Sequence, residues 1–192
     1  MTAESTTSTL HLDARAVKVL AHPLRSRLLS ALRSGGPATA TVLAERLGTN
    51  TGATSYHLRK LEAVGIVEET GEGRGKERWW RASTDMHSFT QRDVAYDADG
   101  QAAAGWLRRY YLRSFLDRYS AWLDEHGSWS LEWQEVADAS DYLLRVSPQR
   151  LAELETELSA LLERYRDPDP DDPDARPVEI DLHAFPLGAA PR

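Results

Sequence analysis

The 192-residue sequence contains no cysteine. This absence excludes disulfides, thiolate metal sites and cysteine nucleophiles, and it is typical of a protein of the reducing cytoplasm. No apolar run approaches the roughly 18 residues that a membrane span needs. The first nine residues have no Lys or Arg and so lack the basic region of a secretory signal. We therefore expect a cytoplasmic protein without membrane contact and a disordered tail over residues 1–11.

Positive charge is also scarce overall, and its distribution is uneven. The net charge is −7, yet residues 1–85 hold 12 Lys and Arg against 9 Asp and Glu, a balance of +3. Residues 86–192 hold 11 against 21, a balance of −10. Binding to a nucleic acid depends on local cationic surface rather than on the total charge. The acidic composition therefore does not exclude such binding by the first half, and the shift indicates a chain of two parts.

Cap signals divide the first 65 residues into short helices. Thr39 is suited to begin a helix that Gly48 ends, because glycine readily adopts the left-handed conformation that closes helices. Asn50 is a plausible cap for the next helix, over residues 51–64, and Gly65 ends it. Helix, tight turn and helix thus occupy about 25 residues.

Two strands are predicted directly after these helices. Residues 67–70 and 77–82 flank a glycine-rich segment and read as a β-hairpin. Trp79 and Trp80 face opposite sides of their strand, so we expect one of them in the core. The arrangement predicts a hairpin that projects beside the helices.

A long helix from about residue 102 to 125 begins the second half, after a connector at residues 85–101. It carries a broad apolar stripe that a partner must cover. The stripe is predicted to form a dimer seam together with core, or alternatively a pocket for an apolar small-molecule effector. Its aromatic members are Trp106, Tyr110, Tyr111, Phe115, Tyr119 and Trp122.

A smaller strand-helix-strand unit is predicted to follow. Residues 141–146 are strand-like, Ser147 and Pro148 form a cap-then-proline signature for a helix, and residues 178–184 alternate apolar and polar side chains. With the preceding long helix this unit forms a C-terminal dimerisation domain over residues 102–192. The predicted fold class is α+β, mainly helical in its first domain.

Three segments together resemble the ArsR family of bacterial repressors. They run from Ala21 to Arg25, from Leu43 to Gly48 and from Ser55 to Val67, within a stretch of about 70 residues. The resemblance implies a winged helix-turn-helix domain over residues 12–84 and a homodimer. Such a dimer places two recognition helices in successive major grooves of double-stranded DNA, usually at a near-palindromic operator, and mostly represses transcription.

The face of the helix over residues 51–64 that would meet DNA follows from 100° per residue. Thr54, Leu58 and Leu61 cluster on one side, suited to the core. We expect His57 to pack or to contact a phosphate rather than to read bases. The predicted DNA-binding residues on this helix are Thr51, Gly52, Ser55, Tyr56, His57 and Arg59.

Arg74 and Lys76 extend the predicted DNA contact to the hairpin tip. They sit among three glycines, where a flexible loop can follow the phosphate backbone or enter the minor groove. The alternative is an ordinary polar tip. A winged fold that has lost DNA binding and serves protein interaction is a further alternative, against which these two cations and Arg59 argue.

Metal sensing, common among ArsR relatives, is not expected. The acid-x-histidine pieces ending at His87 and His126 are not followed by the His-x-x-Glu pair that would complete four ligands. No nucleophile–base pair or phosphate-binding loop is present, so we expect neither a cofactor nor an enzyme.

Overall fold

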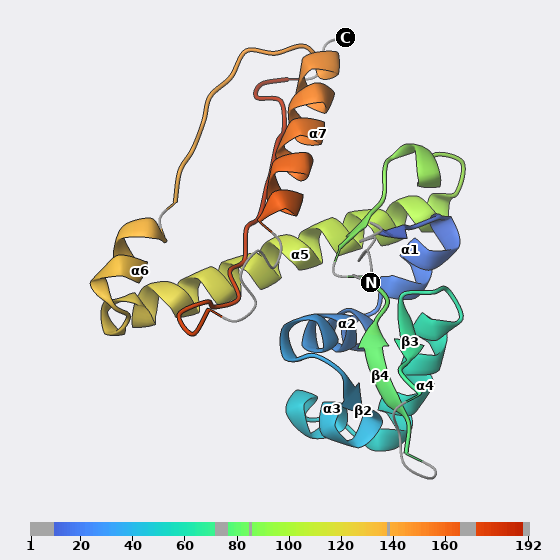
Figure 1. Cartoon of the computed structure of the whole chain (residues 1–192). Helices are drawn as coiled ribbons and strands as arrows, with labels where there is room; N and C mark the ends of the chain where they lie inside the picture. The colour runs from blue at the N-terminus through green and yellow to red at the C-terminus, as the bar shows by residue number, and fades with distance from the viewer. Residues whose placement is uncertain (1–9, 72–76, 85, 138, 166–171, 190–192) are drawn as a thin grey trace, which may run out of the picture. The chain divides into compact units, whose positions relative to one another are not determined.

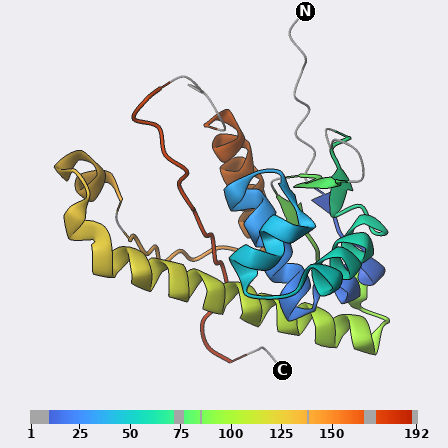
Figure 2. The same cartoon turned by 90° about the horizontal axis from the view of Figure 1, so that it is seen from below.

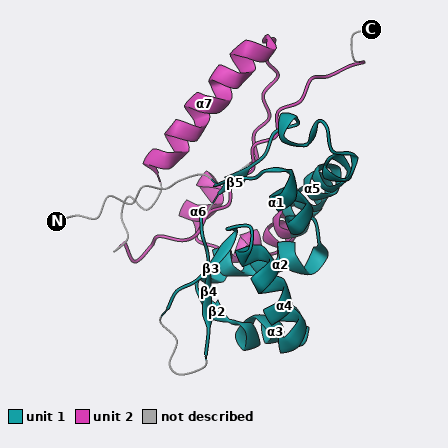
Figure 3. Cartoon of the chain, turned by 90° about the vertical axis from the view of Figure 1, so that its right-hand side faces the viewer, with its two compact units in different colours: residues 1–117 teal, residues 118–192 magenta. Residues whose placement is uncertain are grey.

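The computed structural model describes residues 10–71, 77–84, 86–137, 139–165 and 172–189. The chain divides into two compact units, Met1–Asp117 (unit 1) and Arg118–Arg192 (unit 2), shown in Figure 3. The division falls inside the long helix, whereas we expected it before residue 102.

Unit 1 combines short helices with short strands, as Figure 1 shows. Its helices are α1 (Ala14–Leu20), α2 (Pro23–Gly35), α3 (Ala40–Leu47), α4 (Thr51–Glu62), the 3-10 turn η1 (Arg92–Val94) and the first part of α5 (Ala98–Glu125). Its strands are β1 (Leu10–His11), β2 (Ala38–Thr39), β3 (Val67–Glu69), β4 (Trp79–Ala82) and β5 (His87–Ser88).

The predicted hairpin is present as β3 and β4. These strands pair antiparallel, and β2 joins the other edge of β4, giving the order β2-β4-β3. Two ion pairs link the hairpin strands: Arg81 with Glu68 at 2.7 Å and Arg78 with Glu69 at 2.5 Å. Opposite charges across a strand pair stabilise its register.

The predicted caps are confirmed. The Asn50 side chain accepts a hydrogen bond from the Ala53 amide at 2.8 Å, and Thr39 accepts one from Val42 at 3.3 Å. Gly48 closes α3 with a φ of 62°, a left-handed value that residues with a Cβ rarely adopt. Local chemistry therefore fixes where α3 ends and α4 begins.

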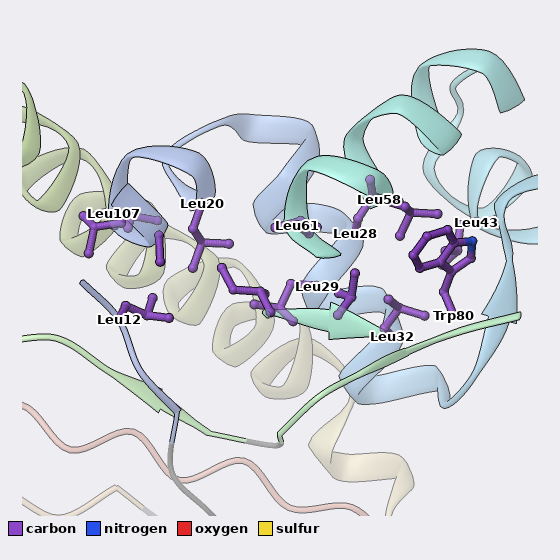
Figure 4. Packing of buried hydrophobic residues seen from close by; sticks show 14 of the residues in the cluster. Leu12, Leu20, Leu28, Leu29, Leu32, Leu43, Leu58, Leu61, Trp80 and Leu107 are labelled. Atoms are coloured by element: carbon purple, nitrogen blue, oxygen red, sulfur yellow. The ribbon is translucent and has the colours of Figure 1, made fainter. Parts of the chain in front are cut away.

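One apolar core unites the elements of unit 1. Figure 4 shows Leu58 and Leu61 of α4 beside Leu28 of α2, and Trp80 beside Leu43 of α3. Trp80 is only 2% exposed, which confirms that one of the paired tryptophans enters the core.

The first turns of α5 belong to the same core. Ala104 and Leu107 are fully buried in it. Figure 2 shows α1 to α4 gathered beside this part of the long helix. Helices α1 to α4 and the first turns of α5 therefore share one hydrophobic core.

Two boundary predictions are wrong at the edges of this core. Residues 10 and 11, placed in the tail, form β1 and pair with β5, and His11 contacts Asp93 at 2.9 Å. The connector contains β5, η1 and the start of α5, where Asp97 accepts a hydrogen bond from the Gly100 amide at 3.0 Å. Two-residue strands and an alanine-rich helix start give no apolar periodicity, which explains why the pattern missed them.

Unit 2 holds the end of α5, the 3-10 turn η2 (His126–Ser128), α6 (Leu131–Val136) and α7 (Pro148–Arg164). The α7 start is as predicted, since Ser147 accepts a hydrogen bond from the Arg150 amide at 3.2 Å. The strands predicted at 141–146 and 178–184 are wrong for the described structure, in which both segments lack a pairing partner. The α+β class is confirmed by unit 1.

Candidate nucleic-acid interface

Helix α4 is held by its buried side. Thr54, Leu58 and Leu61 are fully buried, as predicted, and the Thr54 hydroxyl donates to the Asn50 carbonyl at 3.1 Å. Because these three residues recur at helical spacing, the opposite side of α4 must face outward. The geometry presents that side to any ligand of the helix.

The outward side carries the predicted contact residues. Thr51, Gly52, Tyr56 and Arg59 are exposed, Tyr56 by 54%, and Ser55 is half-buried. The Arg59 guanidinium has no hydrogen bond or ion pair to any residue that the structure describes. An arginine with all five donors available can bind a phosphate or the O6 and N7 acceptors of guanine.

Lys60 is a cation that the sequence reasoning missed. It is exposed, and its Nζ lies 5.5 Å from the centre of the Tyr56 ring. A cation over an aromatic face is attracted by the ring quadrupole. The i, i+4 spacing of tyrosine and lysine was the available signal, and it places a second positive charge beside Arg59.

His57 lies in a cluster with α2. Its ring contacts the His22 ring in a tilted arrangement, with 4.4 Å between centroids, and its Nδ1 lies 3.5 Å from the Arg25 guanidinium. Loss of water contact, then the neighbouring His22 and Arg25, lowers the pKa of His57. The side chain is therefore a neutral packing group between α2 and α4 when no ligand is bound.

Gly52 stands at the exposed start of α4. A Cβ built there would meet Asn50 Oδ1 at 3.4 Å, an ordinary contact distance. The fold therefore accommodates alanine at this position, and the structure of the chain alone does not require a glycine.

The predicted wing contacts Arg74 and Lys76 lie outside the described residues. The two arginines that are described in β4 and just before it, Arg81 and Arg78, are engaged by glutamates of β3. In the described part of the hairpin, cationic side chains thus support the strand pairing.

The aromatic residues of α5 divide into two groups. Trp106 and Tyr111 pack against the unit 1 core, and the Tyr111 hydroxyl lies 2.8 Å from His87 Nε2. Burial raises the pKa of Tyr111. Three others are half-buried: Tyr110, stacked on Trp106 at 5.2 Å, and the pair Tyr119 and Trp122, stacked at 5.8 Å.

A stripe of exposed leucines also lies on α5. Leu112, Leu116 and Leu123 are 45%, 50% and 46% exposed, and Tyr119 lies between the last two. The resulting 4-3-4 spacing is the repeat by which two helices pack as a coiled coil. Phe115, also in the predicted seam set, is half-buried on the same helix.

No group of three His, Asp or Glu side chains in the described part of the chain is placed to hold a metal ion. Within the same residues, no helix is long and apolar enough to span a bilayer.

A family model described as a helix-turn-helix domain matches residues 20–70, which span α2, α3, α4 and β3. The matched stretch is 51 of the 192 residues, and over it the chain is similar to helix-turn-helix domains. The predicted helices and hairpin are present in this order as α3, α4, β3 and β4, the order of a winged helix-turn-helix.

Solved structures similar to the chain carry related descriptions. One is the homodimeric winged helix-turn-helix DNA-binding domain of a possible ArsR-family regulator from Mycobacterium bovis, with 25% identity, covering 48% of this chain and 77% of that one at a TM-score of 0.33. A possible transcriptional regulator for arsenical resistance has 28% identity, with 66% and 98% covered and a TM-score of 0.32.

ZitR from Lactococcus lactis has 16% identity, with 75% and 85% covered and a TM-score of 0.31. No curated protein matches the chain.

Proposed function

We propose that this protein is a cytoplasmic transcriptional repressor that binds a near-palindromic operator as a homodimer, with α4 as the recognition helix. The observation that carries the proposal is the two-sided α4: a fully buried apolar side and an exposed side with Arg59 and Tyr56. This is the arrangement by which a helix-turn-helix presents side chains to the major groove.

The proposed contacts fall into two kinds. Arg59, Ser55 and Thr51 are proposed to read base edges, and Lys60, which is exposed, is proposed to contact a phosphate. Arg74 and Lys76 of the wing tip are proposed to follow the phosphate backbone. His57 holds α4 against α2 and so positions the other residues.

The homodimer is supported by α5. Its exposed leucine stripe, Leu112, Leu116 and Leu123, would leave three large apolar side chains in water in a monomer. A second α5 packed against the stripe would bury this surface, and burial of apolar surface stabilises by roughly 25 cal/mol per Å². The dimer in turn supplies the second α4 that a palindromic operator requires.

The experiment that tests DNA contact is a selection of binding sites from random DNA with the full chain, followed by titration of single variants. We expect Arg59→Ala to weaken binding by about 10- to 100-fold and to relax preference at one base pair of each half-site. Arg74→Ala is expected to weaken binding evenly across sequences and to reduce the salt slope by about 1.

Arg164→Ala is the matched control, because Arg164 is exposed in unit 2 and its loss changes the net charge equally. Unchanged affinity and salt slope in both Arg59→Ala and Arg74→Ala would refute this interface. A reporter gene with the selected site over its promoter tests the sign of regulation, since activation would refute repression and leave DNA binding standing.

A further inference from the structure

Unit 2 has no buried residue among those that the structure describes. Neither α6 nor α7 has a buried residue. Fifteen large apolar side chains of the unit, from Leu123 to Leu187, are exposed. A soluble monomer rarely exposes a contiguous apolar patch larger than roughly 300–600 Å². The described residues of unit 2 therefore leave most of their large apolar side chains uncovered within the unit.

Two extended segments carry much of this surface (Figure 1). In the segment Tyr142–Val146 the exposed fractions of the apolar side chains run from 47% to 84%. In Val178–Leu182, Val178, Ile180 and Leu182 are 56–63% exposed and alternate with two acids. Each segment has five residues, a usual strand length. Tyr142–Val146 has the apolar content of a strand and Val178–Leu182 has the alternation of a strand, yet neither belongs to a sheet in the described structure.

The main chains of the two segments are unpaired. No backbone hydrogen bond joins Tyr142–Val146 or Val178–Leu182 to another residue in the described ranges. An unpaired extended segment presents a row of N–H and C=O groups that can add to a strand of another chain. The side chains and the main chain thus point to the same kind of occupant, a β-strand.

The charges of the two segments are complementary. Arg145 is exposed and forms no ion pair with any described residue, whereas Val178–Leu182 carries Glu179 and Asp181. Loss of water contact and the neighbouring Glu179 raise the pKa of Asp181, so that carboxylate would gain from a further cation. The Tyr142–Val146 segment therefore supplies a cation, and the Val178–Leu182 segment supplies carboxylates that can pair with it.

The exposed area fits a second copy of the chain. Large side chains present on the order of 150–200 Å² each, so fifteen of them, about half exposed, leave roughly 1,500 Å² of apolar surface. A stable interface buries about 800 Å² on each partner.

The second extended segment also contacts the part of α5 that belongs to unit 2. Arg118, next to Tyr119 on α5, forms an ion pair with Glu179 of the second extended segment. The segment is thus anchored at the helix on which the proposed dimer seam lies.

We propose that a second copy of this chain completes unit 2, with the Tyr142–Val146 segment of each protomer pairing as a β-strand with the Val178–Leu182 segment of the partner subunit. The inference rests on the homodimer of the proposed function. A symmetric dimer would form two such strand pairs.

The test uses disulfide trapping in the full chain, where the absence of cysteine means that only introduced thiols can react. Double variants combine Ile180→Cys with Leu143→Cys, Leu144→Cys or Arg145→Cys, which covers neighbouring registers. Under mild oxidation at least one is expected to give a covalent dimer on a denaturing gel. Glu155→Cys with Ile180→Cys is the control, because Glu155 lies on the exposed side of α7, and it is expected to remain monomeric.

Hydrogen exchange on the unmodified chain supplies a second readout. Amides of both segments are expected to exchange at least about tenfold more slowly than in a sample diluted to monomer. A disulfide within one chain, or no bond in any register together with unprotected amides, would overturn the strand exchange.

Sedimentation and DNA titration of the same samples separate the two proposals. A DNA-binding dimer without trapping overturns only the strand exchange. A monomer in solution and on DNA overturns the proposed homodimer as well.

Discussion

Replacing Gly52 by alanine is expected to change the stability of the fold and the affinity for DNA in opposite directions. In the free protein the added methyl group meets only Asn50 Oδ1, at 3.4 Å, and the Asn50 cap to Ala53 stays in place. Alanine is better than glycine in a helix by about 0.5–1 kcal/mol. Because Gly52 is the second residue of α4, we expect a gain at the lower end of this range, and a rise in Tm of about 1–3 °C.

DNA binding is expected to change in the opposite direction. If α4 enters the major groove by its N-terminal end, the methyl group of Gly52→Ala occupies space between backbone and DNA. Overpacking of a close interface costs about 1–3 kcal/mol, so we expect affinity for the selected operator to fall by about tenfold or more. Thermal unfolding and fluorescence anisotropy with labelled DNA measure the two effects.

Gly105→Ala is the matched control for this variant. Gly105 lies within α5, and a Cβ there meets only the flexible Arg109 guanidinium at 3.4 Å. It is expected to raise Tm without changing DNA affinity. Unchanged affinity in Gly52→Ala would refute the close approach of the α4 N-terminus to DNA, and a lowered Tm would refute the local geometry.

Three further outcomes are expected. Asn50→Ala removes the α4 cap and should lower the free energy of unfolding by about 1 kcal/mol in urea titrations, whereas Asn50→Asp should retain most of it. Leu116→Glu places a charge in the α5 stripe and should shift the sedimenting species from dimer to monomer, with Arg113→Glu on the same helix as the control. Burial, reinforced by Arg33, lowers the pKa of His87 to about 4. Because the fold favours the neutral ring, the free energy of unfolding is expected to be unaffected by His87 above about pH 6.5 and to fall by about 3 kcal/mol in all as the pH drops toward 4. A His87→Phe variant that shows the same fall would contradict this assignment.

Local signals explain which features the sequence predicts well. The caps at Thr39 and Asn50 and the left-handed Gly48 depend on neighbours within three or four residues, so residue type alone indicates them. The buried side of α4 follows from helical spacing in the same way. For that reason the helix-turn-helix and the outward position of Arg59 are predictable from residue type and spacing.

Contacts between distant segments are not predictable in this way. The pairing of β1 with β5 joins residues more than 70 positions apart and rests on only two residues in each strand. The contact between the His57 and His22 rings likewise depends on how α2 and α4 cross. The apolar periodicity of one segment does not predict its contact with a segment far away in the sequence.

The missing strands of unit 2 have a different cause. Residues 141–146 and 178–184 do carry strand patterns, but neither segment is paired with another in the described part of the chain. A strand pattern indicates only that a segment can pair. The pattern and the unpaired extended chain agree once the partner is allowed to be a second copy.

Helix α5 links the proposed dimer to the proposed DNA contact. It is one helix of 28 residues, about 42 Å long at 1.5 Å per residue. In its first half, Ala104 and Leu107 are buried in the unit 1 core. In its second half, Leu116 and Leu123 are exposed. If two α5 helices pack along this stripe, the seam sets the separation of the two α4 helices, which must match half-sites about 34 Å apart. A substitution in the seam should therefore alter the preferred half-site spacing, while a substitution on α4 should alter the bases within each half-site.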